Sequence, residues 1–233
     1  MTFDLSPASE SRLSAARQLA DQVLSPAAAE IDRTGSLPDA VSRHLDALNV
    51  WESGSLDAVL MLEALASASA SAAARVALGQ AGGGEGVAGL RGVALVDDPS
   101  DQQRLGLAAV CLGIGRAALD VALDVARQRG DRPAGEPGDP PHWILADAAT
   151  ELDAARLLVR ATAAGHGIDA AGALVFAGGA ARAAVDAAIR LVGPAAWQPG
   201  SVVERCARDI RAALLVAGTE DAARQRAADR LLA

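Results

Sequence analysis

Apolar residues recur every three or four positions along most of the chain, which is the spacing of one face of an α-helix. Near the start, Ser6-Pro7 has the form of a helix N-cap followed by proline at the first helical position. Pro26 is expected to kink or restart this first helix, and Thr34-Gly35 is expected to end it. The same spacing predicts further helices over 36–49, 56–78, 100–129, 142–164, 168–191, 201–216 and 219–232.

Two of these helix starts have the residue pattern of a capping box, in which a serine and a residue three positions later bond to each other's backbone. The pairs are Ser100 with Gln103 and Ser201 with Glu204. Residues 90–96 fit either a short strand or an extended connector, and no convincing run of alternating strands is found. The predicted fold class is therefore all-α, with antiparallel helices joined by short loops.

The glycine-rich segment around 81–86 divides the chain into two helical parts. We expect an N-terminal helical part over 1–80, a linker over 81–99, and an up-and-down four-helix bundle within 100–233. Alanine is abundant; it forms helices well but buries little apolar area per residue. A surface shared with another chain would add burial, which favours an oligomer.

The charge pattern excludes one class of function. The formal net charge is −8, and the basic residues, all arginine, are interleaved with acids. Nucleic-acid binding needs a cationic surface, so it is not expected. The N-terminus lacks the pattern of a signal peptide, and the apolar run over 105–115 is too short to span a membrane. We expect a cytoplasmic protein without a membrane segment.

The cysteines and histidines do not form a recognisable site. Cys111 and Cys206 lie far apart on predicted helices and are expected to be reduced core thiols. His44, His142 and His166 are scattered, without the spacing of metal ligands or of a histidine–carboxylate pair. No metal site is predicted.

The segment 201–222 carries Glu204-Arg205, then Arg208-Asp209, and then Ala217-Gly218-Thr219. This order resembles the C-terminal signature of acyl-CoA dehydrogenases, a paired charged helix followed by a turn and a last helix. Five other segments resemble the family in the same order along the chain, namely 23–35, 37–38, 62–66, 104–129 and 144–156. The charged residues at i, i+4 spacing are expected to form structural ion pairs.

The resemblance implies a protein of the dehydrogenase family that lacks the catalytic base. In many members the residue before Gly-Thr is the catalytic glutamate, and that position is Ala217 here. Other members place the glutamate before an arginine on the long helix, and that position is Gln103. Neither side chain accepts a proton usefully. Asp101 and Glu220 are the acids left nearby, and their spacing does not support such a role.

The resemblance also assigns cofactor and substrate positions. Arg129 matches an arginine that reaches the FAD of a neighbouring subunit, and Gly193 is the one glycine kept from a flavin-contacting segment. Thr219 belongs to the conserved turn and is taken as a third cofactor-binding position. Arg104 matches an arginine near CoA, although it could equally pair with Asp101. The family's flavin-binding middle β-domain has only residues 80–98 in its place.

Three functions follow as alternatives. The first is a non-catalytic, structural subunit that forms a homodimer or a hetero-oligomer with a full-length flavoprotein homologue and binds no cofactor alone. The second is an FAD-dependent acyl-CoA dehydrogenase, an oxidoreductase on an acyl thioester, whose site is completed by a partner. The third is a flavin-free enzyme that uses the vacated cleft. Acyl-CoA is a candidate ligand for the second.

Overall fold

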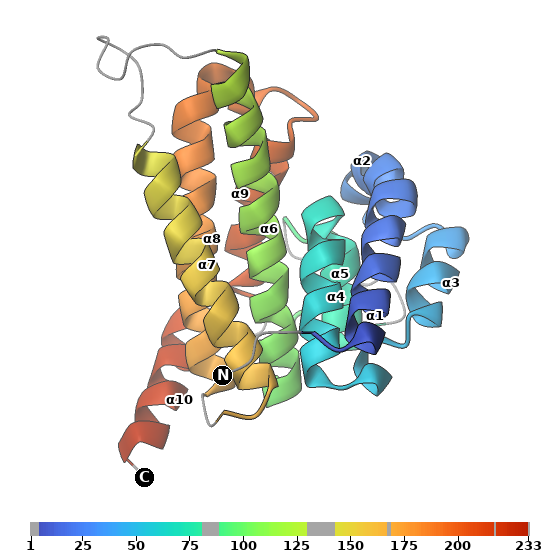
Figure 1. Cartoon of the computed structure of the whole chain (residues 1–233), viewed down its shortest axis with the longest axis vertical. Coiled ribbons are helices and arrows are strands. Elements are labelled where there is room, and N and C mark those ends of the chain that lie inside the picture. Colours follow the sequence, from blue (N-terminus) through green and yellow to red (C-terminus); the bar gives the residue numbers. More distant parts are fainter. Residues whose placement is uncertain (1–4, 81–88, 130–142, 167–168, 217, 233) are drawn as a thin grey trace.

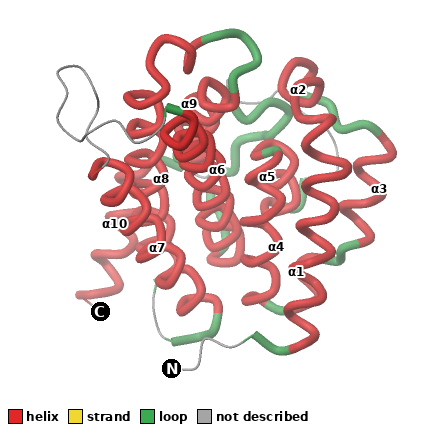
Figure 2. Tube along the Cα trace, turned by 45° about the horizontal axis from the view of Figure 1, so that its top comes forward, coloured by secondary structure: helices red, strands yellow, loops and turns green. Residues whose placement is uncertain are grey.

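The computed structural model of the chain describes residues 5–80, 89–129, 143–166, 169–216 and 218–232. Every regular element in these ranges is a helix, and Figure 2 shows no strand along the described trace. The predicted all-α fold is thus confirmed. Two groups of helices lie side by side, a shorter N-terminal group and a bundle of longer C-terminal helices (Figure 1).

The N-terminal group is built from short helices around a central one, α4. Its elements are α1 (Pro7–Leu19), a π-helical turn η1 (Ala20–Leu24), α2 (Ser25–Thr34), α3 (Asp39–Ala47), a 3-10 turn η2 (Val50–Ser53), α4 (Ser55–Ala68) and α5 (Ala70–Leu78). The π turn ends at Leu24, two residues before Pro26. Because proline has no N–H and its ring crowds the carbonyl four residues earlier, the helix widens there and then restarts.

The single helix predicted over 56–78 is wrong in one respect, because the chain breaks at Ser69. This residue is extended, with φ −149° and ψ 101°. Its hydroxyl accepts a hydrogen bond from the Ala72 N–H at 3.4 Å and so caps the start of α5. The apolar spacing continues through the break, so the periodicity alone did not reveal it.

The C-terminal bundle consists of α6 (Asp101–Gln128), α7 (Trp143–Ala163), α8 (Ala170–Val192) and α9 (Val202–Ala213), followed by α10 (Glu220–Leu232). A 3-10 turn, η3 (Gly193–Trp197), follows α8. The helix α6 is central: it packs against the three other bundle helices and also against α4 and α5. Its capping box forms as predicted, with Ser100 and Gln103 each bonded to the other's backbone. At α9 only the Ser201 half forms, because the Glu204 carboxylate binds Arg208 instead.

Glycines let α6 approach its neighbours on two sides. A Cβ atom on Gly113 would lie 2.5 Å from the Ala66 Cβ in α4, and one on Gly115 would lie 2.9 Å from the Ala181 Cα in α8. Buried side chains from both helical groups form one continuous apolar core. The N-terminal helices and the bundle are therefore packed as one unit, as expected.

Residues 89–99 form a connector that is fastened to both groups. The Gln80 side chain bonds to the backbone N–H and carbonyl of Ala94 at 2.8 and 2.9 Å. The Val96 N–H donates to the Val216 carbonyl at 2.8 Å, and Leu90 is fully buried. Of the two readings of 90–96, the extended connector is the one observed. The rest of the predicted linker, 81–88, lies outside the described residues.

Two segments are long and apolar enough to cross a membrane, α6 and the segment 170–197. Within their apolar windows, 78% and 56% of the residues are buried inside the molecule. Helices at the centre of a bundle have this composition because their neighbours cover them on several sides. The packing of α6 against α8 accounts for it here.

Candidate functional site

Gln103, at one of the two expected base positions, has a structural role. Its side-chain nitrogen donates to the Leu78 carbonyl at 3.1 Å, and its side-chain oxygen accepts from the Ser100 N–H at 2.9 Å. Both polar atoms of the amide are thus used in hydrogen bonds at the junction of α5 and α6. The other base position, Ala217, lies outside the described residues.

The two acids nearest these positions are held in ion pairs. Asp101 lies 3.3 Å from Arg104 and 3.7 Å from Arg230, both measured between guanidinium nitrogen and carboxylate oxygen. Glu220 pairs with Arg182 at 3.3 Å and with Arg224. Each of the two carboxylates is thus already paired with two guanidinium groups. Neither acid is poised to replace a missing base.

Arg104 is buried, with 6% of its surface exposed. Its guanidinium lies 3.3 Å from Asp101 and 3.7 Å from Asp98. Pairing with Asp101, the alternative to a CoA contact, is therefore formed. A CoA contact would have to compete with both carboxylates, and that role stays a prediction.

The three predicted cofactor positions are spread over the bundle. Arg129 caps the C-terminal end of α6 and is exposed. Gly193 ends α8 with φ 72°, a conformation that favours glycine. Thr219 caps α10, its hydroxyl accepting from the Ala222 N–H at 3.1 Å. Because α6 has 28 residues, it separates Arg104 from Arg129 by about 40 Å. One chain therefore does not bring Arg104 and Arg129 together at one site.

The charged motif on α9 joins this helix to α2. Arg208 donates two hydrogen bonds to Asp32, at 3.0 and 2.8 Å, and two to Glu204, at 2.6 and 3.0 Å. These bonds raise the pKa of the Arg208 guanidinium above its ordinary value. The structural role predicted for Glu204 and Arg208 is confirmed.

The expected pairing of Asp209 with Arg205 is not formed within the described part of the chain. Asp209 is 3% exposed, and its Oδ1 atom has no hydrogen-bond partner. Burial raises the pKa of this carboxyl to about 8, and the nearby charge of Asp32 adds to the effect. The i, i+4 spacing placed the two residues on one helix edge, but the packing of α9 turns Asp209 inward.

The predicted thiols are confirmed as free and buried. Cys111 lies in the middle of α6 and Cys206 lies in α9. Burial raises the pKa of each thiol to about 12. Neither sulfur is activated as a nucleophile.

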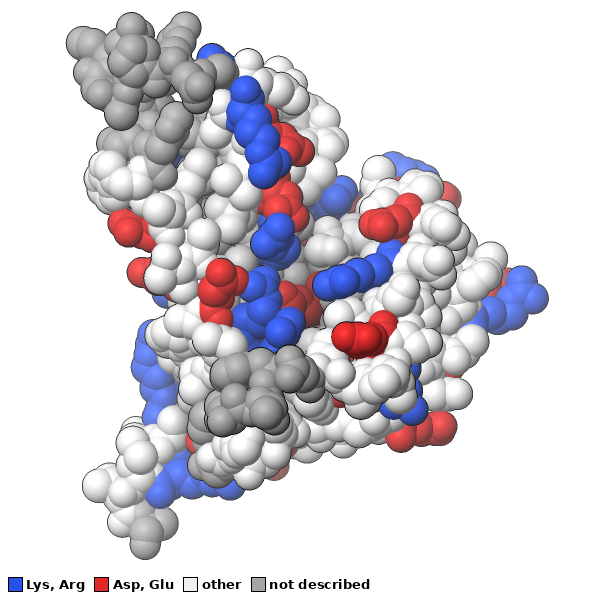
Figure 3. Space-filling view, in the orientation of Figure 1, with Lys and Arg blue, Asp and Glu red and all other residues white. Residues whose placement is uncertain are grey.

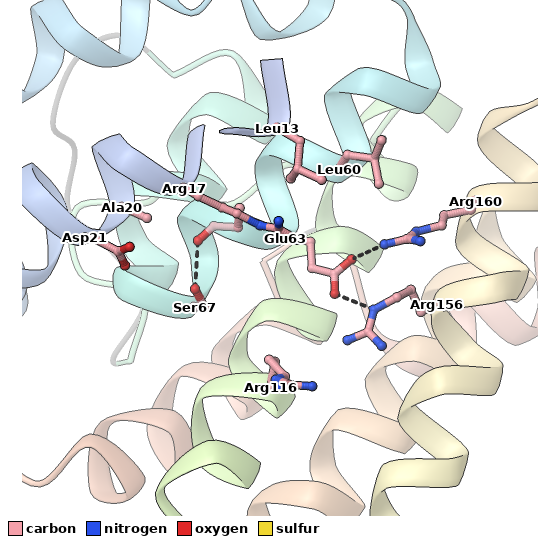
Figure 4. Close-up of a pocket in the computed structure, with 11 residues that line it drawn as sticks. Leu13, Arg17, Ala20, Asp21, Leu60, Glu63, Ser67, Arg116, Arg156 and Arg160 are labelled. Carbon is pink, nitrogen blue, oxygen red and sulfur yellow. Dashed lines mark hydrogen bonds and ion pairs between the residues drawn. The ribbon is translucent and has the colours of Figure 1, made fainter. Parts of the chain in front are cut away.

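An arginine-lined pocket, which the sequence did not reveal, lies between the two helical groups. It has a volume of about 500 Å³, and side chains from α1, α4, α6 and α7 line it. Figure 4 shows Glu63 among four arginines, Arg17, Arg116, Arg156 and Arg160. In Figure 3 basic side chains follow this hollow face, with acids between them. The one local signal was the pair Arg156 and Arg160, like charges at i, i+4 spacing on one helix face.

A second concave surface is apolar and lies on the far side of the bundle from the N-terminal helices. It is a groove of about 810 Å³ between α8 and α10, with Glu151 of α7 at its edge. Phe176 and Leu231 line it and are 46% and 88% exposed. Leu157 of α7 and Leu232 are exposed as well. Large apolar side chains exposed together are typical of an interaction surface.

Sequence comparison relates the C-terminal part of the chain to a known protein family. Residues 91–232 match the family described as acyl-CoA dehydrogenase, C-terminal domain. A 3-sulfinopropanoyl-CoA desulfinase of Paraburkholderia xenovorans (strain LB400) is 37% identical over 137 residues, which are 56% of this chain and 35% of that protein. An acyl-CoA dehydrogenase of Bacillus subtilis (strain 168) is 38% identical over 128 residues, 51% of this chain and 33% of that protein. The matched stretch thus spans about a third of these curated relatives.

Structure comparison extends the likeness to the whole chain. The structure of butyryl-CoA dehydrogenase from Megasphaera elsdenii superposes with a TM-score of 0.80 and 17% identity, over 100% of both chains. At this identity the comparison establishes the fold. Within the described residues the present chain has the helical fold of these proteins and contains no β-domain.

Proposed function

We propose a subunit role for this chain, which belongs to the acyl-CoA dehydrogenase family through the match of residues 91–232. The chain would form a homodimer, or a hetero-oligomer with a full-length flavoprotein homologue, and would not itself catalyse dehydrogenation. It would bind no cofactor when alone. We place it in the cytoplasm.

The observation that carries this proposal is that neither of the two expected base positions holds an acidic residue. Dehydrogenation of an acyl thioester needs a carboxylate to take the α-proton while a flavin accepts hydride. One position holds Ala217, and the other holds Gln103, whose amide is bonded to the backbone of Leu78 and Ser100. The missing β-domain removes one wall of the flavin site in addition.

The apolar groove supports the oligomeric part of the proposal. Phe176 and Leu231 expose apolar surface that a second helical bundle could cover. Burial of such surface contributes about 25 cal/mol per Å². The alanine-rich core also gives each helix little apolar area of its own, so a shared interface adds stability that the single chain lacks.

The partner-completed enzyme remains the second candidate because Arg129 is exposed at the free end of α6. From there it could reach a flavin held by another subunit. Relatives such as the 3-sulfinopropanoyl-CoA desulfinase act on a CoA thioester, which keeps acyl-CoA as a candidate ligand. In the part of the chain that the structure describes, no group of residues supports the flavin-free alternative.

Size-exclusion chromatography with light scattering tests the proposal. The chain should elute as a dimer, or co-elute with a full-length homologue from the same genome, and should show no flavin absorbance near about 450 nm when alone. Phe176→Asp should weaken the assembly, whereas Leu95→Asp, at an exposed leucine on the connector, should not. A monomer that binds no homologue would contradict the subunit role. A bound flavin that is bleached by an acyl-CoA would favour the enzyme.

A further inference from the structure

In the pocket between α1, α4, α6 and α7, four arginines lie around Glu63, a glutamate whose side chain is mostly buried. We propose that this pocket is a binding site for a small ligand that carries a phosphate group. Gln103 is not among the residues that line this pocket, and the site does not depend on the proposed subunit role. Its volume of about 500 Å³ falls within the range of ligand sites, roughly 300–1,000 Å³.

Glu63 accepts a hydrogen bond from one arginine and forms only a longer ion pair with a second. The Arg156 Nε atom donates to the Glu63 carboxylate at 2.6 Å, and Arg156 also pairs with Asp153. Arg160 lies farther from the same carboxylate, at 3.7 Å, which is too long for a hydrogen bond. Its Nε atom is buried and has no hydrogen-bond partner among the residues that the structure describes. A buried donor of this kind costs free energy unless a ligand or water accepts from it.

Two further arginines offer donors at the open side of the pocket. Arg116 uses its Nε atom to bind Asp120 at 3.0 Å, which leaves its terminal nitrogens available. Arg17, on α1, is exposed and has no ion pair among the described residues. Figure 4 shows that Arg17 and Arg160 extend toward Glu63 from opposite sides, with Arg116 below them. Donors from α1, α6 and α7 thus converge on one space.

The charge balance inside the pocket favours an added anion. The pKa of Arg160 is lowered, first by burial and then by the positive charges of Arg156 and Arg17, and Glu63 offsets this only in part. The other acid on the wall, Asp21, is exposed. An anion between these guanidinium groups would relieve the repulsion and accept the unused hydrogen bonds.

Phosphate fits this arrangement better than a carboxylate does. A carboxylate presents two oxygens and suits one guanidinium fork, whereas a phosphate group presents three and can accept from arginines on several sides. The donors here come from three different helices, so they surround a position instead of facing it from one direction. The volume leaves room for the rest of a phosphorylated molecule.

Isothermal titration calorimetry of the full chain tests the site, with inorganic phosphate, pyrophosphate and succinate at matched ionic strength. Pyrophosphate should bind, and Arg160→Gln or Arg116→Gln should weaken it about tenfold or more. Arg127→Gln is the control because Arg127 lies on the same helix as Arg116, is exposed, and pairs with Asp124 outside the pocket. It should leave the dissociation constant within about twofold.

Two results would overturn the proposal. The first is that neither phosphate nor pyrophosphate binds the unaltered chain. The second is that Arg127→Gln weakens pyrophosphate binding as much as the pocket variants do, which would indicate general attraction to the charged surface. Succinate that binds as tightly as pyrophosphate would overturn the choice of phosphate. Should Arg160→Gln fold poorly, the exposed Arg116→Gln variant keeps the test decisive.

Discussion

The side-chain amide of Gln103 donates to the backbone carbonyl of Leu78 at 3.1 Å, which ties the first turn of α6 to the last turn of α5. The carbonyl at the end of α5 lacks a partner within its own helix, so this bond satisfies a helix end. A glutamate at position 103 could not donate there at neutral pH. The residue at this expected base position thus serves the packing of two helices.

We therefore expect Gln103→Glu to destabilise the chain by about 1–2 kcal/mol at pH 7, because a carboxylate would face the Leu78 carbonyl without a proton. No dehydrogenase activity should appear. Urea denaturation followed by circular dichroism measures the change. Gln102→Glu, at an exposed position on the same turn, is the matched control and should be close to neutral. Equal stability of the two variants would contradict the role given to the bond.

The buried carboxyl of Asp209 predicts that the stability of the folded chain depends on pH. Its folded-state pKa of about 8 lies above the ordinary value of 3.8, so the folded chain keeps a proton that the unfolded chain has released between these values. Stability should therefore fall as the pH rises from about 4 to 8 through this group. Asp209→Asn should remove that part of the fall and raise stability at pH 8 by about 1–3 kcal/mol.

The measurement for Asp209 is the free energy of unfolding at pH 5 and pH 8. Asp186→Asn, at an exposed acid on α8, serves as the control and should leave the pH profile nearly unchanged. A variant at Asp209 that is less stable at pH 8 than the unaltered chain would show that the ionised carboxylate is stabilising.

Two glycines offer a test of helix packing. Gly113→Ala should destabilise the chain by about 2–3 kcal/mol, because its Cβ would lie 2.5 Å from both the Ala66 Cβ and the Glu63 carbonyl oxygen. Gly179→Ala on α8 meets nothing within 4 Å and should stabilise by up to about 1 kcal/mol through helix propensity. Thermal unfolding of the pair separates packing from propensity. A stabilising Gly113→Ala would disprove the close approach of α4 and α6.

The buried thiols should be unreactive in the folded chain. Because burial raises the pKa of Cys111 and Cys206 to about 12, neither forms thiolate at pH 8. Ellman's reagent should label both thiols in about 6 M guanidinium chloride and react only at the rate of unfolding in buffer. Ser14→Cys, at an exposed position on α1, provides a fast-reacting control. Rapid labelling of the unaltered folded chain would contradict the burial.

Much of the helical layout could be predicted from the sequence because its signals are local. Ser6-Pro7 and Ser100 with Gln103 mark helix starts through bonds that span three residues. The break at Ser69 escaped prediction because the apolar pattern runs through it. Helix existence was therefore easier to predict than helix continuity.

The sites depend on packing between distant segments, and here local patterns were insufficient. Arg156 and Glu63 are 93 positions apart, so no spacing rule connects them. Asp209 and Arg205 have the spacing of an ion pair, yet burial in the bundle prevails over that pattern. The family resemblance did locate Gln103, but only the structure showed what its amide binds.

The bonds between Gln80 and Ala94 have a consequence for the evolution of the chain. They join residues 80 and 94, which lie on either side of the glycine-rich segment at 81–86. Since the entropy of closing a loop grows only with the logarithm of its length, each doubling adds about 0.6 kcal/mol. A segment whose ends are already joined can therefore be lengthened or shortened with little effect on the helices around it. This junction is where an insertion is expected to be tolerated best.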